Sequence, residues 1–353
     1  MRVAIFSTKY YEREYLDRSN AEGRHQLSYF DRALTEESAD LAIGADAVSV
    51  LLGDAVDAGV IGRLYGNRIR MISLRSAGYD NVDVEAAAKV SIRVFRVSAY
   101  SPRAIAEHAV ALILALDRKT HKAYVRVRQN DFSLNGLMGF DLFGKTVGVV
   151  GTGKIGRAFC EIMLGFGCKV IAYDIRVSET MVAKGVQYVT FDRLLQLSDI
   201  ISIHCPLTAD TRHLFDASAF AKMKVGAMLI NTGRGAVLDT AQAVASLKEE
   251  RLGNLGIDVY EGEESLFFKD LSGSVVQDDM IERLMSFGNV LITPHQAFFT
   301  REAVEQIASM TIGNFTDFED EKISENEVKG KEAMVSRSYV NEMSPDVIAE
   351  AIY

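Results

Sequence analysis

The chain has 353 residues, enough for two domains of ordinary size, and its 48% hydrophobic content can supply two cores. Its formal net charge is −9 and it contains no basic run, which argues against a nucleic acid or an anionic membrane as a partner. The three cysteines are an odd set with no CxxC motif, so neither a disulfide framework nor a metal site is indicated.

The N-terminal part of the chain predicts an α/β domain with a parallel sheet. Polar helical stretches such as 36–41 separate short apolar runs, and these runs cover 2–7, 47–52, 69–74 and 92–97. The apolar run at 3–6 is too short for a signal peptide, and the longest apolar helix face, 109–116, is far below the roughly 18 residues of a membrane span. A cytoplasmic protein is therefore expected.

A loop and a helix start follow these runs. The loop 75–81 (RSAGYDN) comes at the carboxyl end of a strand, where open α/β sheets bind ligands. Backbone N–H groups around Gly78 could bind an anion, or the loop could be an ordinary glycine turn. Ser101-Pro102 predicts a helix start, and we interpret this helix as the connection between two domains. Tyr100, just before it, would then lie at the mouth of the cleft between these domains.

The stretch 144–174 predicts a dinucleotide-binding unit. A strand at 145–150 runs into GTGKIG at 151–156, and a helix at 157–167 and a second strand at 169–173 follow. Gly151 allows the tight turn, Gly153 lets the backbone approach the pyrophosphate, and Gly156 lets helix and strand pack closely. A βαβ unit that binds no nucleotide is the alternative, and the complete context argues against it.

Asp174 ends the second strand and indicates which dinucleotide is bound. Its carboxylate can accept hydrogen bonds from ribose hydroxyls and would repel a 2′-phosphate, which favours NAD over NADP. Arg176, two positions on, weakens this preference.

Further strands at 200–205, 228–231, 255–259 and 290–293 complete a second domain inside the first. An amphipathic helix at 301–318 can then pack back on the N-terminal domain. We expect 1–100 and 297–330 to form one doubly wound domain, 101–296 the Rossmann domain, and 331–353 a C-terminal extension. Ser344 could begin a last short helix there, to which we assign no function.

Three residues at expected strand ends suit hydride transfer to a 2-keto acid. Arg234 offers a planar fork for a carboxylate, His295 can carry a proton near neutral pH, and Glu263 would keep the imidazole charged and oriented. Alternatives exist: Arg234 could pair with a surface acid, Glu263 could belong to a solvated acidic cluster, and His204 is as well placed as His295. The remaining histidines are expected to be surface or packing residues, namely His25, His108, His121 and His213.

At this point the motifs resemble those of the D-2-hydroxyacid dehydrogenases. They are RSAGYDNVD, VSAYSPRAIAEH, VGVVGTGKIG, HCPLT, NTGRGAVLD, GIDVYEGE and TPHQAFFT. The block FFKDLSGSVVQDD looks like the fermentative D-lactate dehydrogenase branch. The likeness covers about residues 1 to 328, and the tail beyond it is longer than this branch leads us to expect.

The resemblance implies a flavodoxin-like substrate domain with an inserted Rossmann domain, and NADH-dependent reduction of pyruvate to D-lactate in a homodimer or homotetramer. It implies Arg234 as substrate anchor, His295 as general acid/base and Glu263 as its orienting carboxylate. Ala77, Gly78, Tyr100 and Phe298 would form the pocket. The implied NAD site comprises Gly151, Gly153, Lys154, Ile155, Gly156, Asp174, Cys205, Pro206, Thr211, Thr232, Gly233 and Asp258. A dehydrogenase for a bulkier 2-keto acid and an NAD-sensing binding protein remain alternatives.

Overall fold

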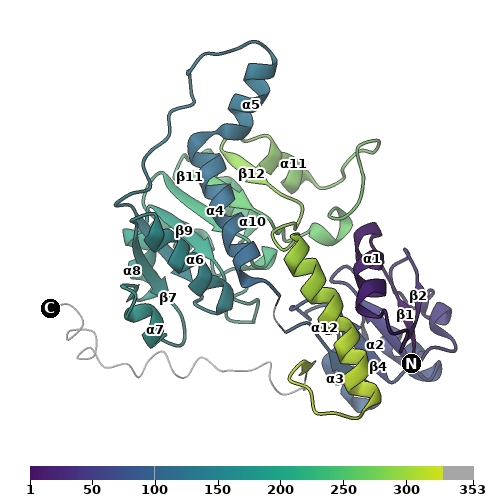
Figure 1. Cartoon of the computed structure of the whole chain (residues 1–353). Coiled ribbons are helices and arrows are strands. Elements are labelled where there is room, and N and C mark those ends of the chain that lie inside the picture. The colour runs from purple at the N-terminus through teal and green to yellow at the C-terminus, as the bar shows by residue number, and fades with distance from the viewer. Residues whose placement is uncertain (99, 329–353) are drawn as a thin grey trace. The chain divides into compact units, whose positions relative to one another are not determined.

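The computed structural model describes residues 1–98 and 100–328, which divide into two compact units (Figure 1). Unit 1 consists of Met1–Ser101 and 299–328, and unit 2 of Pro102–Phe298. The predicted C-terminal extension at 331–353, with its expected helix, lies outside the described residues.

Unit 1 contains a parallel sheet with one antiparallel edge strand. The strand order is β13-β5-β4-β3-β1-β2, so the first five strands follow the flavodoxin-like order 2-1-3-4-5. Only the β13–β5 pair is antiparallel. The expected parallel sheet is confirmed, although β2 and β13 were not predicted. The strands are β1 (Arg2–Ile5), β2 (Gln26–Tyr29), β3 (Ala47–Val50), β4 (Met71–Leu74), β5 (Arg93–Phe95) and β13 (Glu327–Val328).

The helices of unit 1 cover this sheet. They are α1 (Tyr10–Ser19), α2 (Ala58–Gly66), α3 (Val84–Lys89), α12 (Arg301–Glu319) and the 3-10 helix η1 (Ala39–Ala42). The expected packing of α12 on the N-terminal sheet is confirmed, since Phe315 shares a buried cluster with Ile5 and Phe95. The helical stretch expected at 36–41 is present only in part, as the 3-10 helix η1 from Ala39, with turns at 36–38. There the hydroxyl of Ser38 donates to Ala33 O at 2.7 Å and accepts from the N–H of Thr35 at 2.8 Å, and such local bonds compete with an α-helix.

Unit 2 contains a wholly parallel sheet of seven strands. Its order is β12-β11-β10-β9-β6-β7-β8, which is the Rossmann order 3-2-1-4-5-6 with a seventh strand added. The direction of winding reverses between β6 and β9, so ligands are expected at the carboxyl ends of these strands. The strands are β6 (Thr146–Val150), β7 (Lys169–Tyr173), β8 (Gln187–Tyr188), β9 (Ile200–Ile203), β10 (Ala227–Asn231), β11 (Leu252–Ile257) and β12 (Val290–Ile292).

The helix that begins at Pro102 belongs to the core of unit 2, which is more than the connection that we expected. It packs on α6, β10 and β11, and Leu112, Ile113 and Leu116 are buried in a cluster with side chains of α6 and β10. The helices of this unit are α4 (Pro102–Arg118), α5 (Thr120–Arg128), α6 (Lys154–Gly165), α7 (Glu179–Val182), α8 (Phe191–Leu197), α9 (Ala217–Lys222), α10 (Thr240–Lys248) and α11 (Asp279–Met285), with the 3-10 helices η2 (Gly235–Val237) and η3 (Glu263–Ser265).

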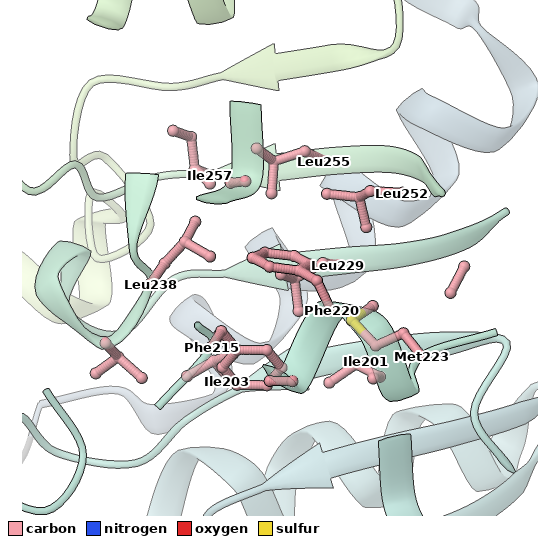
Figure 2. Close-up of a cluster of buried hydrophobic side chains, with 14 of the residues drawn as sticks. Ile201, Ile203, Phe215, Phe220, Met223, Leu229, Leu238, Leu252, Leu255 and Ile257 are labelled. Atoms are coloured by element: carbon pink, nitrogen blue, oxygen red, sulfur yellow. The ribbon is translucent and has the colours of Figure 1, made fainter. Parts of the chain in front are cut away.

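A second buried cluster lies on the opposite face of the same sheet (Figure 2), since it takes the alternate residues of β6, β7, β9 and β10. It joins side chains of three neighbouring strands, such as Ile201, Leu229 and Leu255, to Phe215 and to Phe220 of α9. β9 and β10 are buried along their whole length because they are covered on both faces. This packing fixes the strand ends from which the candidate site is built.

Phe315→Ala tests the packing of α12. The ring is fully buried, so its removal should lower the free energy of unfolding by about 3–5 kcal/mol. Ile323→Ala is the control, because that side chain is 96% exposed. Chemical denaturation followed by circular dichroism measures both variants. Equal stabilities of the two would contradict the role given to α12.

Candidate active site

His295 and Glu263 form a closed imidazole–carboxylate pair in unit 2. Nδ1 of His295 lies 2.8 Å from Oε1 of Glu263, and the two side chains are 12% and 22% exposed. The second carboxylate oxygen accepts the backbone N–H of Tyr260 at 2.9 Å, so the carboxylate cannot rotate freely. Since an ionised carboxylate only accepts, Nδ1 carries a proton, and Nε2 is the nitrogen that can exchange one with a ligand.

The loop that carries His295 is held by the buried carboxylate of Asp258, at the end of β11. That carboxylate is inaccessible to solvent. It accepts the Thr293 hydroxyl at 2.5 Å and the backbone N–H groups of Gln296 and Ala297 at 2.9 and 2.8 Å. His295 has a left-handed φ of 54°, and its own N–H donates to Asp258 O at 2.8 Å. A non-glycine residue in this conformation costs about 1–3 kcal/mol, which these bonds offset.

His108 of α4 supports the same loop. Its Nε2 lies 3.0 Å from the Thr293 hydroxyl and 3.4 Å from the Asp258 carboxylate. Because the Thr293 hydroxyl gives its single proton to Asp258, it must accept from Nε2–H of His108. Sequence analysis treated His108 as an ordinary packing residue, and no local motif could have revealed this contact.

Arg234 lies on a tight turn after β10 that packs against the loop of Glu263. The buried side chain of Asn231 shapes this turn, since it donates to Arg234 O at 2.9 Å and accepts the N–H of Gly233 at 3.0 Å. A Cβ atom on Gly235 would lie 2.2–2.4 Å from the backbone of Tyr260 and Glu261. Glycine is therefore needed for the two loops to approach.

His204 and Cys205 follow β9 and are not suited to proton exchange. His204 Nε2 lies 2.9 Å from the Ser202 hydroxyl, and its ring packs 4.9 Å from that of Phe159. Desolvation lowers the pKa of His204 to about 3, so the imidazole stays neutral and is a poor alternative to His295 as a proton donor. Burial raises the pKa of Cys205 to about 12, which keeps its thiol protonated.

The glycine turn after β6 has the steric features that the sequence predicted. Gly151 has a φ of 91°, and a Cβ on Gly156 would lie 2.0 Å from Gly151 O, which confirms the predicted close packing. A Cβ on Gly153 would meet nothing within 4 Å. No side chain caps the start of α6 at Lys154 and Ile155, so its N–H groups remain available for an anion.

The other residues assigned to the NAD site follow the carboxyl ends of β7, β9, β10 and β11 in the same sheet. The Asp174 carboxylate accepts the N–H of Thr152 at 2.5 Å and that of Arg176 at 3.0 Å, which fixes it at the end of β7. The Thr211 hydroxyl donates to Pro206 O at 2.7 Å. The Thr232 hydroxyl is buried and has no hydrogen-bond partner among the described residues. A buried hydroxyl without a partner at the carboxyl end of β10 fits a ligand at this edge of the sheet.

The predicted pocket residues Ala77, Gly78 and Tyr100 belong to unit 1, and Phe298 ends unit 2. Within unit 1 the loop 75–81 is fixed by the Ser76 hydroxyl, which donates to Gly78 O at 2.8 Å. The described part of the chain contains no group of acidic, histidine or cysteine side chains that could hold a metal ion, and no helix in it could cross a membrane.

Comparison with known proteins places this site in a family. Residues 110–297 match the family model of the D-isomer specific 2-hydroxyacid dehydrogenase NAD binding domain. D-lactate dehydrogenase of Escherichia coli is 44% identical over 93% of this chain and 100% of its own length.

Two solved structures are also similar. The structure of a pyruvate reductase of Chlamydomonas reinhardtii has a TM-score of 0.87 at 41% identity, covering 92% of this chain and 98% of that one. D-lactate dehydrogenase from Aquifex aeolicus, solved with NAD and lactic acid, has a TM-score of 0.84 at 31% identity over 92% of this chain and 98% of its own. The chain therefore belongs to the D-isomer specific 2-hydroxyacid dehydrogenase family, with the family's NAD-binding domain at residues 110–297.

Proposed function

We propose that this protein is an NAD-dependent D-lactate dehydrogenase, which reversibly reduces pyruvate to D-lactate. The observation that carries the proposal is the fixed pair of His295 and Glu263, 2.8 Å apart, on the two loops that follow β12 and β11 of the NAD-binding sheet. D-lactate dehydrogenases among the similar proteins support pyruvate as the substrate. When bound, NADH supplies the hydride that reaches C2 of the keto acid.

His295 is the proposed proton donor. Its Nδ1–H is held by Glu263, so Nε2 of the imidazolium can protonate the carbonyl oxygen as negative charge develops on it. In the reverse direction the neutral Nε2 accepts the hydroxyl proton of D-lactate. The Glu263 carboxylate favours the charged imidazole and keeps the ring in one orientation.

Arg234 is the proposed anchor for the substrate. Its guanidinium can bind the substrate carboxylate with two parallel hydrogen bonds and stabilise charge on the neighbouring carbonyl oxygen. We propose that backbone N–H groups of Ala77 and Gly78 also bind the carboxylate, with Tyr100 and Phe298 against the methyl group.

We assign the cofactor preference to Asp174. Its fixed carboxylate lies at the end of β7, where it can accept ribose hydroxyls and would repel a 2′-phosphate. All three cysteines are free, which fits a reducing compartment, and we propose that the protein acts in the cytoplasm.

We further propose that the protein is a homo-oligomer joined through residues 120–143, which we call the arm. α5 opens the arm, projects from the body of unit 2 in Figure 1, and has no buried residue. A nine-residue helix is marginal alone, and concentrated exposed apolar side chains mark an interaction site. Those of the arm are Tyr124, Val125, Val127, Phe132, Leu134, Met138, Phe140 and Phe143.

The substrate assignment is tested by NADH oxidation with a series of 2-keto acids from pyruvate to phenylpyruvate, with NADPH as the alternative cofactor. We expect pyruvate and NADH to give the highest kcat/KM, and chiral analysis to find D-lactate. A higher kcat/KM for a bulkier keto acid would contradict the pyruvate assignment. Tight NADH binding without turnover on any substrate would instead indicate a sensing protein.

Glu263→Gln should lower the pH above which pyruvate reduction declines. The neutral amide no longer stabilises the imidazolium, so His295 loses its proton at a lower pH. The pH dependence of kcat/KM for both proteins measures the shift, with Glu264→Gln as the neighbouring control. Identical pH profiles for the wild type and Glu263→Gln would refute the role of this carboxylate.

Arg234→Lys should lose most activity although it keeps the positive charge. Loss of the planar fork removes about 2 kcal/mol of stabilisation, or roughly 30-fold in kcat/KM for pyruvate. Arg251→Lys, at the opposite end of the same sheet, serves as the control. Wild-type kcat/KM in Arg234→Lys would exclude bidentate anchoring.

Leu134→Asp should disrupt the proposed association. This side chain is 82% exposed, so the charge is harmless in a monomer and costly in an apolar interface. Light scattering after size exclusion should give a smaller mass for Leu134→Asp than for the wild type or for Val225→Asp, whose side chain is 75% exposed outside the arm. A monomeric wild type would contradict the proposal.

A further inference from the structure

A second imidazole–carboxylate pair lies beside the site and has no part in the chemistry described so far. Nε2 of His213 lies 2.6 Å from Oε1 of Glu261, and the other oxygen of Glu261 accepts the Thr240 hydroxyl at 3.2 Å. Nδ1 of His213 lies 3.9 Å from the Asp239 carboxylate. His213 and Glu261 are 39% and 31% exposed, so they are accessible but not extended into solvent.

His213 belongs to the segment that follows the proposed NAD-lining residues Pro206 and Thr211. Its backbone N–H donates to Ala236 O at 2.8 Å, and the N–H of Phe215 donates to Val237 O at 3.1 Å. The segment 213–215 therefore runs beside the turn that immediately follows Arg234. His213 has a left-handed φ of 51°, a backbone conformation that is uncommon for residues other than glycine.

Glu261 belongs to the loop that carries Glu263. In that loop the N–H of Tyr260 holds the Glu263 carboxylate at 2.9 Å, and Gly235 packs against the backbone of Tyr260 and Glu261. The contact between His213 and Glu261 is thus a direct side-chain tie between the proposed cofactor segment and the loop of the catalytic carboxylate.

A half-exposed ion pair contributes little to folding, typically about 0–1 kcal/mol. The geometry of a catalytic pair is far more sensitive, since a displacement of about 1 Å can cost about 100-fold in rate. Loss of this contact can therefore lower the reaction rate without lowering the stability of the fold.

We propose that His213 and Glu261 are positioning residues that hold the Glu263 loop and the cofactor segment in register. The inference rests on the proposed function, because it assigns the pair to the reaction of His295. It acts through Glu263: when the tie is lost, the carboxylate moves relative to the imidazole that it orients.

His213→Asn and Glu261→Gln test this role, alone and combined. Each should lower kcat for pyruvate by about 10-fold and lower the pH above which reduction declines, as Glu263→Gln does but to a smaller extent. Each should also weaken NADH binding several-fold, measured by fluorescence titration. The double variant should lose no more than either single variant, because both break one contact.

Asp192→Asn is the matched control, since it breaks an exposed ion pair with Lys222 at 2.8 Å in the same unit. It should keep the wild-type kcat, pH profile and NADH affinity, and all variants should keep the wild-type melting temperature. Variants that match the control in pH profile and NADH affinity, or multiplicative losses in the double variant, would overturn the positioning role. A wild type that binds NADH and reduces no 2-keto acid would refute the proposed function instead.

Discussion

The buried carboxylate of Asp258 is the interaction on which the candidate site most depends. Removing a carboxylate from water is costly unless its oxygens are bonded, and here hydrogen bonds from Thr293, Gln296 and Ala297 serve them. These bonds close the loop around His295 and offset its left-handed backbone. His108 completes the support from α4. The proposed proton donor is therefore held in place by a buried carboxylate that needs no contact with the substrate.

Glycines provide the complementary constraint, since they let backbone segments approach where any side chain would collide. Gly235 brings the Arg234 turn against the Glu263 loop, and Gly156 brings α6 against the turn after β6. The first contact serves the proposed proton transfer, and the second serves the proposed phosphate site. Both lie at the carboxyl edge of the same sheet, after β6 and β10, which flank β9, and this is why one parallel sheet can hold cofactor and catalytic groups together.

Apolar runs predicted the central strands because both faces of a parallel sheet are covered. Apolar runs did not predict β2, whose residues alternate between exposed and half-buried, or β13, which has only two residues. The turn after β6 was predictable because local steric constraints explain why each of its glycines is needed. The pairing of Glu263 with His295 was supported by resemblance to a family, since residues so far apart in sequence are joined only by the fold. No local sequence pattern indicated the contacts of His108, of Asn231 or of the His213–Glu261 pair.

The most direct test of the account concerns the proton on His295. Oxamate is an unreactive analogue of pyruvate, and its binding to the NADH complex should require the imidazolium. We expect the oxamate dissociation constant of the wild type to rise as the pH increases, and His295→Gln to remove this dependence. An affinity independent of pH in the wild type, or an unchanged dependence in His295→Gln, would contradict the assignment of His295 as the proton donor.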